Sequence, residues 1–162
     1  MQFLRLVLAV AIVKRAYLVR LYAGAYAPAI FLERMIKMLQ AYSLNVTVPT
    51  DSAVPFNNVS VKKGCTVNMN GVSSIELNKC GVYMVSVDSS AVAASTLQLF
   101  KNGIAQAQAQ ATGTTPSFVS LIQVPQNNSC CCCSEPTVIQ VKNVGDASAT
   151  LSDANIVVTK VC

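Results

Sequence analysis

Residues 97–104 read Leu-Gln-Leu-Phe-Lys-Asn-Gly-Ile, and this stretch decides the fold class. Two leucines alternate with other residues and lead to Asn102-Gly103, a dipeptide preferred in two-residue hairpin turns because both positions tolerate a positive φ. A return strand begins at Ile104, and alanine alternates with glutamine through residue 111. The stretch predicts a β-hairpin whose second strand has one face flat enough for a neighbouring chain to approach.

Short runs of the same kind continue on both sides of this hairpin. They are rich in β-branched residues and are separated by turn residues at intervals of about ten residues, with no helical run between them. This pattern predicts an all-β sandwich or barrel and excludes a parallel βαβ architecture. The predicted strands are 43–48, 59–61, 66–69, 74–77, 81–88, 96–101, 104–111, 117–124, 137–142 and 156–161.

The first forty residues differ from the remainder in charge and composition. Residues 1–40 hold six basic residues against Glu33, a net charge of +5, whereas residues 41–162 hold six lysines and six acids, which sum to zero. Helix-forming residues with one break near residues 24–28 predict two helices, 2–22 and 29–41. We therefore expect a basic helical anchor, 1–40, and a β domain, 41–162. The basic residues of the anchor are Arg5, Lys14, Arg15, Arg20, Arg34 and Lys37.

The predicted anchor does not have the pattern of a membrane span or of a nucleic-acid-binding arm. Its longest apolar stretch is residues 6–13, far short of a span. Its cations scatter around a helical wheel and are separated by aliphatic residues, so they form neither an amphipathic face nor a basic stripe. This pattern favours a crevice between protein subunits. Leu32, Met35, Leu39 and Tyr42 recur at coiled-coil spacing, which fits a short coiled-coil seam or a helix packed on its own domain.

Three segments of the β domain together resemble a known family. They are Gly81-Val-Tyr-Met-Val-Ser-Val87, Leu97-Gln-Leu-Phe-Lys-Asn-Gly103 and Ala154-Asn-Ile-Val-Val-Thr-Lys160. Their order and spacing resemble the ten-strand jelly roll of the tumour necrosis factor and complement-head superfamily, in particular its microbial branch of bacteriophage head-fibre proteins and collagen-like exosporium proteins. The resemblance covers residues 41–162. The chain departs from the exosporium type because it lacks a Gly-X-Y stalk.

The resemblance implies a homotrimer that displays loops at its tip and carries no catalytic site. Trimerisation also accounts for the low proportion of charged residues, 12%, because a subunit interface covers uncharged surface. A charge at Leu97 or Leu99 is then expected to abolish assembly. The residues expected to form the trimer contact or the core are Leu32, Met35, Leu39, Tyr83, Val85, Leu97 and Leu99.

The seven cysteines invite a metal or redox interpretation. Four of them are consecutive, namely Cys130, Cys131, Cys132 and Cys133. Adjacent cysteines diverge too strongly to chelate one zinc ion well, so a loop of free or cross-linked thiols is expected, with metal binding by three copies at a trimer axis as the alternative. Cys65 and Cys80 each precede a predicted strand and are a candidate disulfide pair, and Cys162 is a candidate partner of the consecutive cysteines.

Catalysis is not expected from this composition. Histidine is absent, which removes the usual general base and the commonest metal ligand, and no carboxylate pair stands out. We expect no cofactor, no bound metal and no nucleic-acid partner. The predicted function is a virion structural protein, a trimeric capsid decoration or head-fibre protein whose residues 1–40 dock on capsid proteins and whose distal loops contact host-surface glycans. The alternative is a bacterial cell- or spore-surface adhesion trimer with an N-terminal export or anchoring segment.

Overall fold

The described part of the chain is built from β-strands and the turns between them. The computed structural model describes residues 37–125 and 136–161. Ten strands lie within these ranges: β1 (Lys37–Val48), β2 (Asn58–Lys63), β3 (Val67–Asn70), β4 (Ser74–Leu77), β5 (Gly81–Ala91), β6 (Ser95–Lys101), β7 (Ile104–Gly113), β8 (Ser117–Val124), β9 (Thr137–Asn143) and β10 (Ala149–Lys160).

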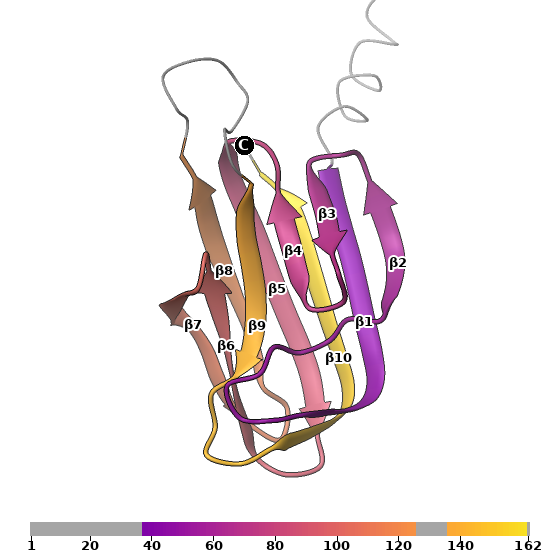
Figure 1. Ribbon diagram of the computed structural model, residues 1–162, viewed down its shortest axis with the longest axis vertical. Helices are drawn as coiled ribbons and strands as arrows, with labels where there is room; N and C mark the ends of the chain where they lie inside the picture. Colours follow the sequence, from indigo (N-terminus) through magenta and orange to yellow (C-terminus); the bar gives the residue numbers. More distant parts are fainter. Residues whose placement is uncertain (1–36, 126–135, 162) are drawn as a thin grey trace, which may run out of the picture. The chain divides into compact units, whose positions relative to one another are not determined.

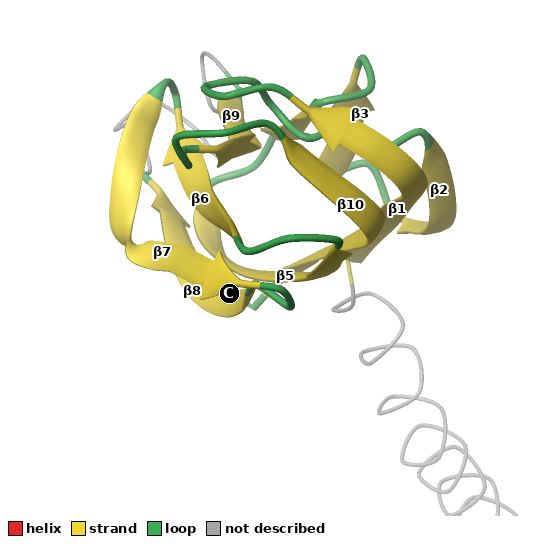
Figure 2. Ribbon diagram, turned by 90° about the horizontal axis from the view of Figure 1, so that it is seen from below, coloured by secondary structure: helices red, strands yellow, loops and turns green. Residues whose placement is uncertain are grey.

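The strands form two antiparallel five-stranded sheets. The first sheet has the order β2-β1-β10-β5-β8 and the second has the order β3-β4-β9-β6-β7 (Figure 1). Seen from one end, the two sheets face each other across the interior (Figure 2). Consecutive strands repeatedly cross from one sheet to the other, which is the connectivity of a jelly roll, so the predicted all-β jelly roll with ten strands is confirmed.

The hairpin at residues 97–104 has the tight turn that the sequence predicts at Asn102-Gly103. Asn102 and Gly103 have φ values of 49° and 78°, so both residues adopt the left-handed conformation that a tight hairpin turn between twisted strands requires. The Asn102 side-chain oxygen also accepts a hydrogen bond from the Val138 amide at 2.8 Å. The turn is therefore tied to the neighbouring strand β9 as well as to its own hairpin.

The first strand corrects the predicted helix at residues 29–41. Residues 37–41 belong to β1, which pairs with β10 from Lys37 opposite Lys160 to Val48 opposite Ala149. The alternation of buried Leu39 and Ala41 with half-buried neighbours has the period of a strand, and pairing with β10 outweighs local helix propensity. The β domain therefore begins by Lys37, and Leu39 and Tyr42 do not extend a helical seam. The rest of the predicted helices lies outside the described residues.

The last strand is also longer than predicted. It begins at Ala149, seven residues before the predicted start at Ile156, because polar residues such as Ser152 and Asn155 occupy positions that do not point into the core. Polar residues at outward positions do not interrupt a strand whose inward positions, such as Leu151 and Ala154, are buried.

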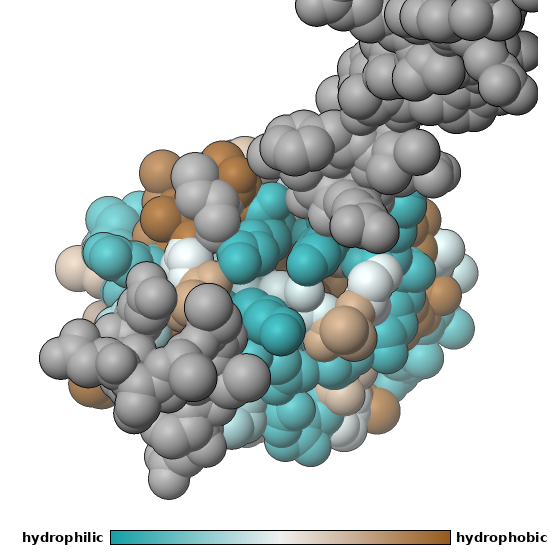
Figure 3. Space-filling view, turned by 90° about the horizontal axis from the view of Figure 1, so that it is seen from above, coloured by the Kyte–Doolittle hydropathy of each residue, from teal (hydrophilic) through white to brown (hydrophobic). Residues whose placement is uncertain are grey.

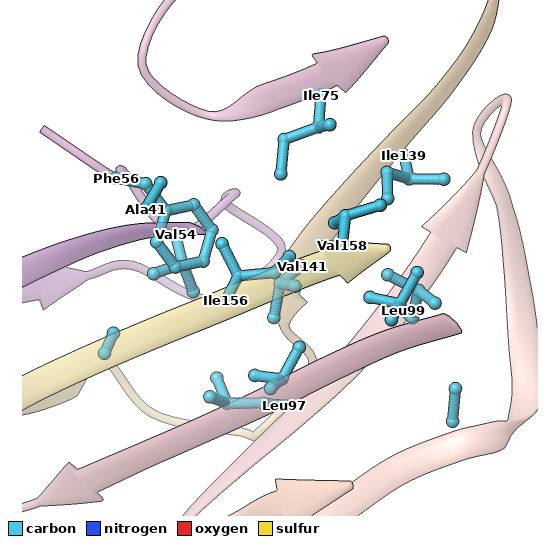
Figure 4. Close-up of a cluster of buried hydrophobic side chains, with 14 of the residues drawn as sticks. Ala41, Val54, Phe56, Ile75, Leu97, Leu99, Ile139, Val141, Ile156 and Val158 are labelled. Carbon is cyan, nitrogen blue, oxygen red and sulfur yellow. The ribbon is translucent and has the colours of Figure 1, made fainter. Parts of the chain in front are cut away.

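Inward-pointing aliphatic side chains from both sheets fill the space between them. Ile156 and Val158 of β10 meet Leu97 and Leu99 of β6 and Val141 of β9 (Figure 4). All five are at most 1% exposed. Burying each such side chain contributes about 1.5–3 kcal/mol of hydrophobic stabilisation relative to leaving it in water.

One buried polar residue fixes the end of the sandwich at which β9 finishes. The fully buried Asn143 side chain donates to the carbonyls of Val48 at 3.0 Å and Ala147 at 2.8 Å, and it accepts from the Gly145 amide at 3.0 Å. Its main-chain carbonyl accepts from the Asp51 amide. A single side chain therefore holds the β9–β10 turn against the end of β1.

Candidate assembly surface

The outward face of the first sheet is unusually apolar. Along β5, Tyr83 and Val85 point into the core and are fully buried, whereas Val82, Met84 and Ser86 occupy the alternating outward positions. Successive side chains in a strand point to opposite faces, so a strand with apolar residues at both sets of positions is expected to be covered on both sides. Within the described part of one chain, only the inner side of β5 is covered.

Neighbouring strands extend this apolar surface. Met84 lies opposite Leu121 of β8 and opposite Thr159 of β10, and Ser86 lies opposite Val119. Met84 is 37% exposed, Leu121 is 62% exposed and Val119 is 61% exposed. Directly opposed side chains on paired strands are in contact distance of one another, so these residues form one continuous surface.

Among the described residues, charged side chains are missing from the centre of this face. The outward partners of Val82, Met84 and Ser86 are Gln123, Leu121 and Val119 on one side, and Val161, Thr159 and Val157 on the other. Depletion of charge together with clustered aliphatic side chains is typical of the core of a protein–protein interface. We call this set, Val82, Met84, Ser86, Val119, Leu121 and Val157, the apolar face.

The outward face of the second sheet is different in kind. Its polar side chains bond to each other: the hydroxyls of Thr96 and Thr112 are 2.9 Å apart, and Gln140 donates to Ser74 at 2.8 Å. The Lys142 ammonium lies 4.9 Å from the centre of the Phe100 ring. This face is suited to contact with water, because its polar groups are exposed and already partnered.

Five of the seven residues expected in the trimer contact or the core lie in the core of one chain. Leu39, Tyr83, Val85, Leu97 and Leu99 are all fully buried in the core. They are therefore not available for contact with another copy, and a charge at Leu97 or Leu99 is expected to unfold the subunit before it affects assembly. Leu32 and Met35 lie outside the described residues.

The predicted anchor residues are mostly not described. Lys37 begins β1, while Arg5, Lys14, Arg15, Arg20 and Arg34 lie outside the described residues. Their role in docking stays a prediction.

The two described cysteines are not bonded to each other. Cys65 is exposed, Cys80 is half-buried, and both carry free thiols. The candidate disulfide between them is therefore not formed in this structure, which corrects the predicted pairing. The predictions for the other five cysteines, as cross-linked thiols or as metal ligands at a trimer axis, stay untested because all five lie outside the described residues: Cys130, Cys131, Cys132, Cys133 and Cys162.

The described residues offer no cluster of metal-binding groups. Among them, no three Cys, Asp or Glu side chains gather in a way that could hold a metal ion. A depression of about 400 Å³ lies beside the β9–β10 turn, and Asp146 is the one ionisable residue in its lining. Within the same ranges, no helix has the length and hydropathy needed to span a bilayer.

The strands that form the apolar face were predicted from the sequence, but the face itself was not. The available signal was the run from Val82 to Val87, in which apolar residues occupy both sets of alternating positions. Such a run indicates a strand buried on both sides. The contribution of Val119 and Leu121 depended on knowing that β8 is the neighbour of β5.

Comparison with known proteins identifies the fold. No family model matches the sequence, and no curated protein matches it. Solved structures do match. The globular domain of zebrafish complement 1qA superposes with a TM-score of 0.62 at 9% identity, covering 78% of this chain and 98% of that one. The fold is that of the tumour necrosis factor and complement 1q heads.

Two further structures extend this likeness. The vertex protein P5 of phage PRD1 matches with a TM-score of 0.55 at 12% identity, covering 78% of this chain and 97% of that one. The Eiger TNF of S. frugiperda matches with a TM-score of 0.52 at 13% identity, covering 78% and 94%. The TNF-like jelly roll inferred from the three sequence segments is therefore confirmed, and identities this low establish the fold alone.

Proposed function

We propose that this protein is a non-enzymatic structural subunit that assembles as a homotrimer through its apolar face. The observation that carries the proposal is the exposure of Met84, Val119 and Leu121 side by side on one sheet. A contiguous apolar patch of this kind on a soluble domain marks a surface that another molecule covers. The fold shared with the complement and tumour necrosis factor heads supports a second and third copy of the same chain as the molecules that cover it.

The proposed setting is the outer surface of a virion. The residues before β1, 1–36, would dock on capsid proteins, and the β domain would decorate the particle, with its distal loops free to contact host-surface glycans. The fold shared with a phage vertex protein supports this setting, as does the segregation of six of the basic residues into the first forty positions. The docking segment then supplies the attachment, and the jelly roll supplies the trimer.

Light scattering coupled to size-exclusion chromatography tests the assembly. The full chain is expected to have the mass of three copies, and Leu121→Asp is expected to have the mass of one copy while keeping its β-sheet circular dichroism, because the charge would be desolvated only in the trimer. The matched control is Gln140→Asp on the outward face of the second sheet, which is expected to stay trimeric. A monomeric wild-type chain, or a trimeric Leu121→Asp, contradicts the proposed interface.

The intact mass of the protein isolated from its natural particle tests the setting. Retention of Met1–Gln40 is expected for a capsid-docking segment. Cleavage near Ala25 or Ala27 would instead support the alternative of an exported cell- or spore-surface adhesion trimer.

A further inference from the structure

The lysines of the β domain gather at one end of the jelly roll. Lys37 at the start of β1 lies opposite Lys160 at the end of β10, and on the other side of β1 the partners of Met38 and Leu39 are Lys63 and Lys62. Three adjacent strands therefore bring four lysines to one end of the sheet, within three successive positions of β1, although the sequence separates the first from the last by more than a hundred residues. This end, seen in Figure 3, carries hydrophilic side chains over the tops of the strands.

Two more lysines, from other elements, lie at the same end of the domain. The main-chain carbonyl of Lys79, just before β5, accepts a hydrogen bond from the Tyr83 hydroxyl, and Tyr83 pairs with Lys160. The Lys101 ammonium at the end of β6 donates to the Gln123 carbonyl of β8 at 2.7 Å, so it bridges the two sheets at the same end. We call this set, Lys37, Lys62, Lys63, Lys79, Lys101 and Lys160, the lysine end.

The opposite end of the same domain is acidic. Asp51 follows β1 and bonds to Asn143, Asp146 lies in the β9–β10 turn, and Asp88 and Asp153 lie toward the far ends of β5 and β10. At the lysine end the one described carboxylate is Glu76, giving six minus one, or +5; at the other end four aspartates against Lys142 give −3. The described residues, with seven lysines and five acids, carry a net charge of +2 and divide into two ends of opposite sign.

The lysines are unfavourably placed within the chain itself. Lys37 and Lys160 are like charges directly opposite each other on paired strands, an arrangement that destabilises a sheet. Among the described residues, none of the six lysines forms an ion pair with a carboxylate. Residues 1–36, which precede Lys37 in the sequence, hold five basic residues against Glu33. Glu135, between β8 and β9 in the sequence, is a single carboxylate against these lysines, so a negatively charged partner surface would complement this end.

The residue types at the lysine end favour a protein partner over a nucleic acid or a lipid surface. All four arginines precede residue 35, so the described domain attracts anions through lysines alone. The exposed large apolar residues of the described domain include no aromatic ring that could stack on a base or anchor in a lipid headgroup layer. Separate, flexible lysines on a blunt end suit an array of carboxylates on a facing protein surface.

We propose that the lysine end is a docking surface for an acidic protein surface. The inference rests on the proposed function in one respect: a homotrimer would present three lysine ends side by side, with three basic segments attached to them. The docking partner is then the part of the larger particle on which the trimer stands, and the acidic end of the domain faces away from it.

Binding of the full chain to immobilised poly-L-glutamate tests the surface. Replacement of four lysines in one chain, Lys37→Gln, Lys62→Gln, Lys63→Gln and Lys160→Gln, is expected to weaken binding by roughly tenfold or more, since each exposed pair contributes a small increment. The dependence of binding on salt should fall in the same variant, because fewer charges are screened. Lys62→Gln and Lys142→Gln form a matched single pair, and only the first should weaken binding.

Three outcomes would overturn the proposal. They are a four-lysine variant that binds poly-L-glutamate like the wild type, equal effects of Lys62→Gln and Lys142→Gln, and tighter lysine-dependent binding to duplex DNA or to phosphatidylserine-containing vesicles than to poly-L-glutamate. Should the four-lysine variant fail to fold, the exposed pair Lys62→Gln and Lys63→Gln on β2 carries the same test.

The mass of each variant by light scattering separates this inference from the proposed function. A trimer that no longer binds poly-L-glutamate supports the docking surface. A wild-type monomer that binds poly-L-glutamate through the lysine end supports the docking surface and contradicts the trimer.

Discussion

The two sheets of the jelly roll have the same number of strands and share one core, yet their outward faces differ. The first sheet exposes Met84, Val119 and Leu121 to solvent, whereas the second sheet pairs Thr96 with Thr112 and places Lys142 over Phe100. Inward positions are equivalent in both sheets because they fill the same space. Folding constrains the residue types at the inward positions but leaves those at the outward positions free to vary. The outward residues of each sheet therefore indicate whether that face is suited to contact with another subunit.

The largest expected loss of stability comes from placing a charge at an inward position, and the loss should be similar in the two sheets. Val85→Asp in the first sheet and Leu97→Asp in the second are both expected to lower the free energy of unfolding by more than about 4 kcal/mol, because each buries an unpaired carboxylate at a fully enclosed site. Urea denaturation followed by circular dichroism measures the loss. A Leu97→Asp variant that is folded but monomeric would contradict the equivalence of the two inward positions and would indicate that Leu97 lies in the subunit interface.

A smaller effect is expected from trimming the outward apolar residues. Leu121→Ser should raise the dissociation constant of the trimer by at least about a hundredfold, because each of three subunits loses roughly 1–2 kcal/mol of apolar burial. Val72→Ser changes a residue that is 55% exposed in the β3–β4 turn and should leave the constant unchanged. Sedimentation equilibrium measures both variants, and equal effects would mean that the two exposed residues do not differ in role.

The smallest loss of stability is expected from a substitution on the outward face of the second sheet. Lys142→Gln removes the cation above the Phe100 ring and should lower the free energy of unfolding by about 0.5 kcal/mol, the usual contribution of an exposed cation–π contact. The trimer mass should not change. A loss of assembly in this variant would place the interface on the second sheet instead of the first.

Much of the fold could be predicted from local pattern. Alternation and turn residues located all ten strands, and two of them, Ser74–Leu77 and Ser117–Val124, have the predicted bounds. The error at residues 37–41 arose because Met38, Leu39 and Gln40 favour a helix locally, while their strand partners lie at the other end of the chain. Tyr83 and Val85 were expected in the trimer contact or the core, and the structure places both in the core.

The sequence by itself determined the all-β class, the hairpin at Asn102-Gly103 and the concentration of basic residues in the first forty positions, because each depends on neighbours along the chain. Only the tertiary structure decided which exposed aliphatic residues share a face and which charges share an end. Met84 meets Leu121, and Lys37 meets Lys160, through strand pairing over long separations. The charges of residues 41–162 sum to zero along the sequence, but the positive and negative side chains gather at opposite ends of the domain. This separation arises because antiparallel strands return distant residues to the same end of a sheet.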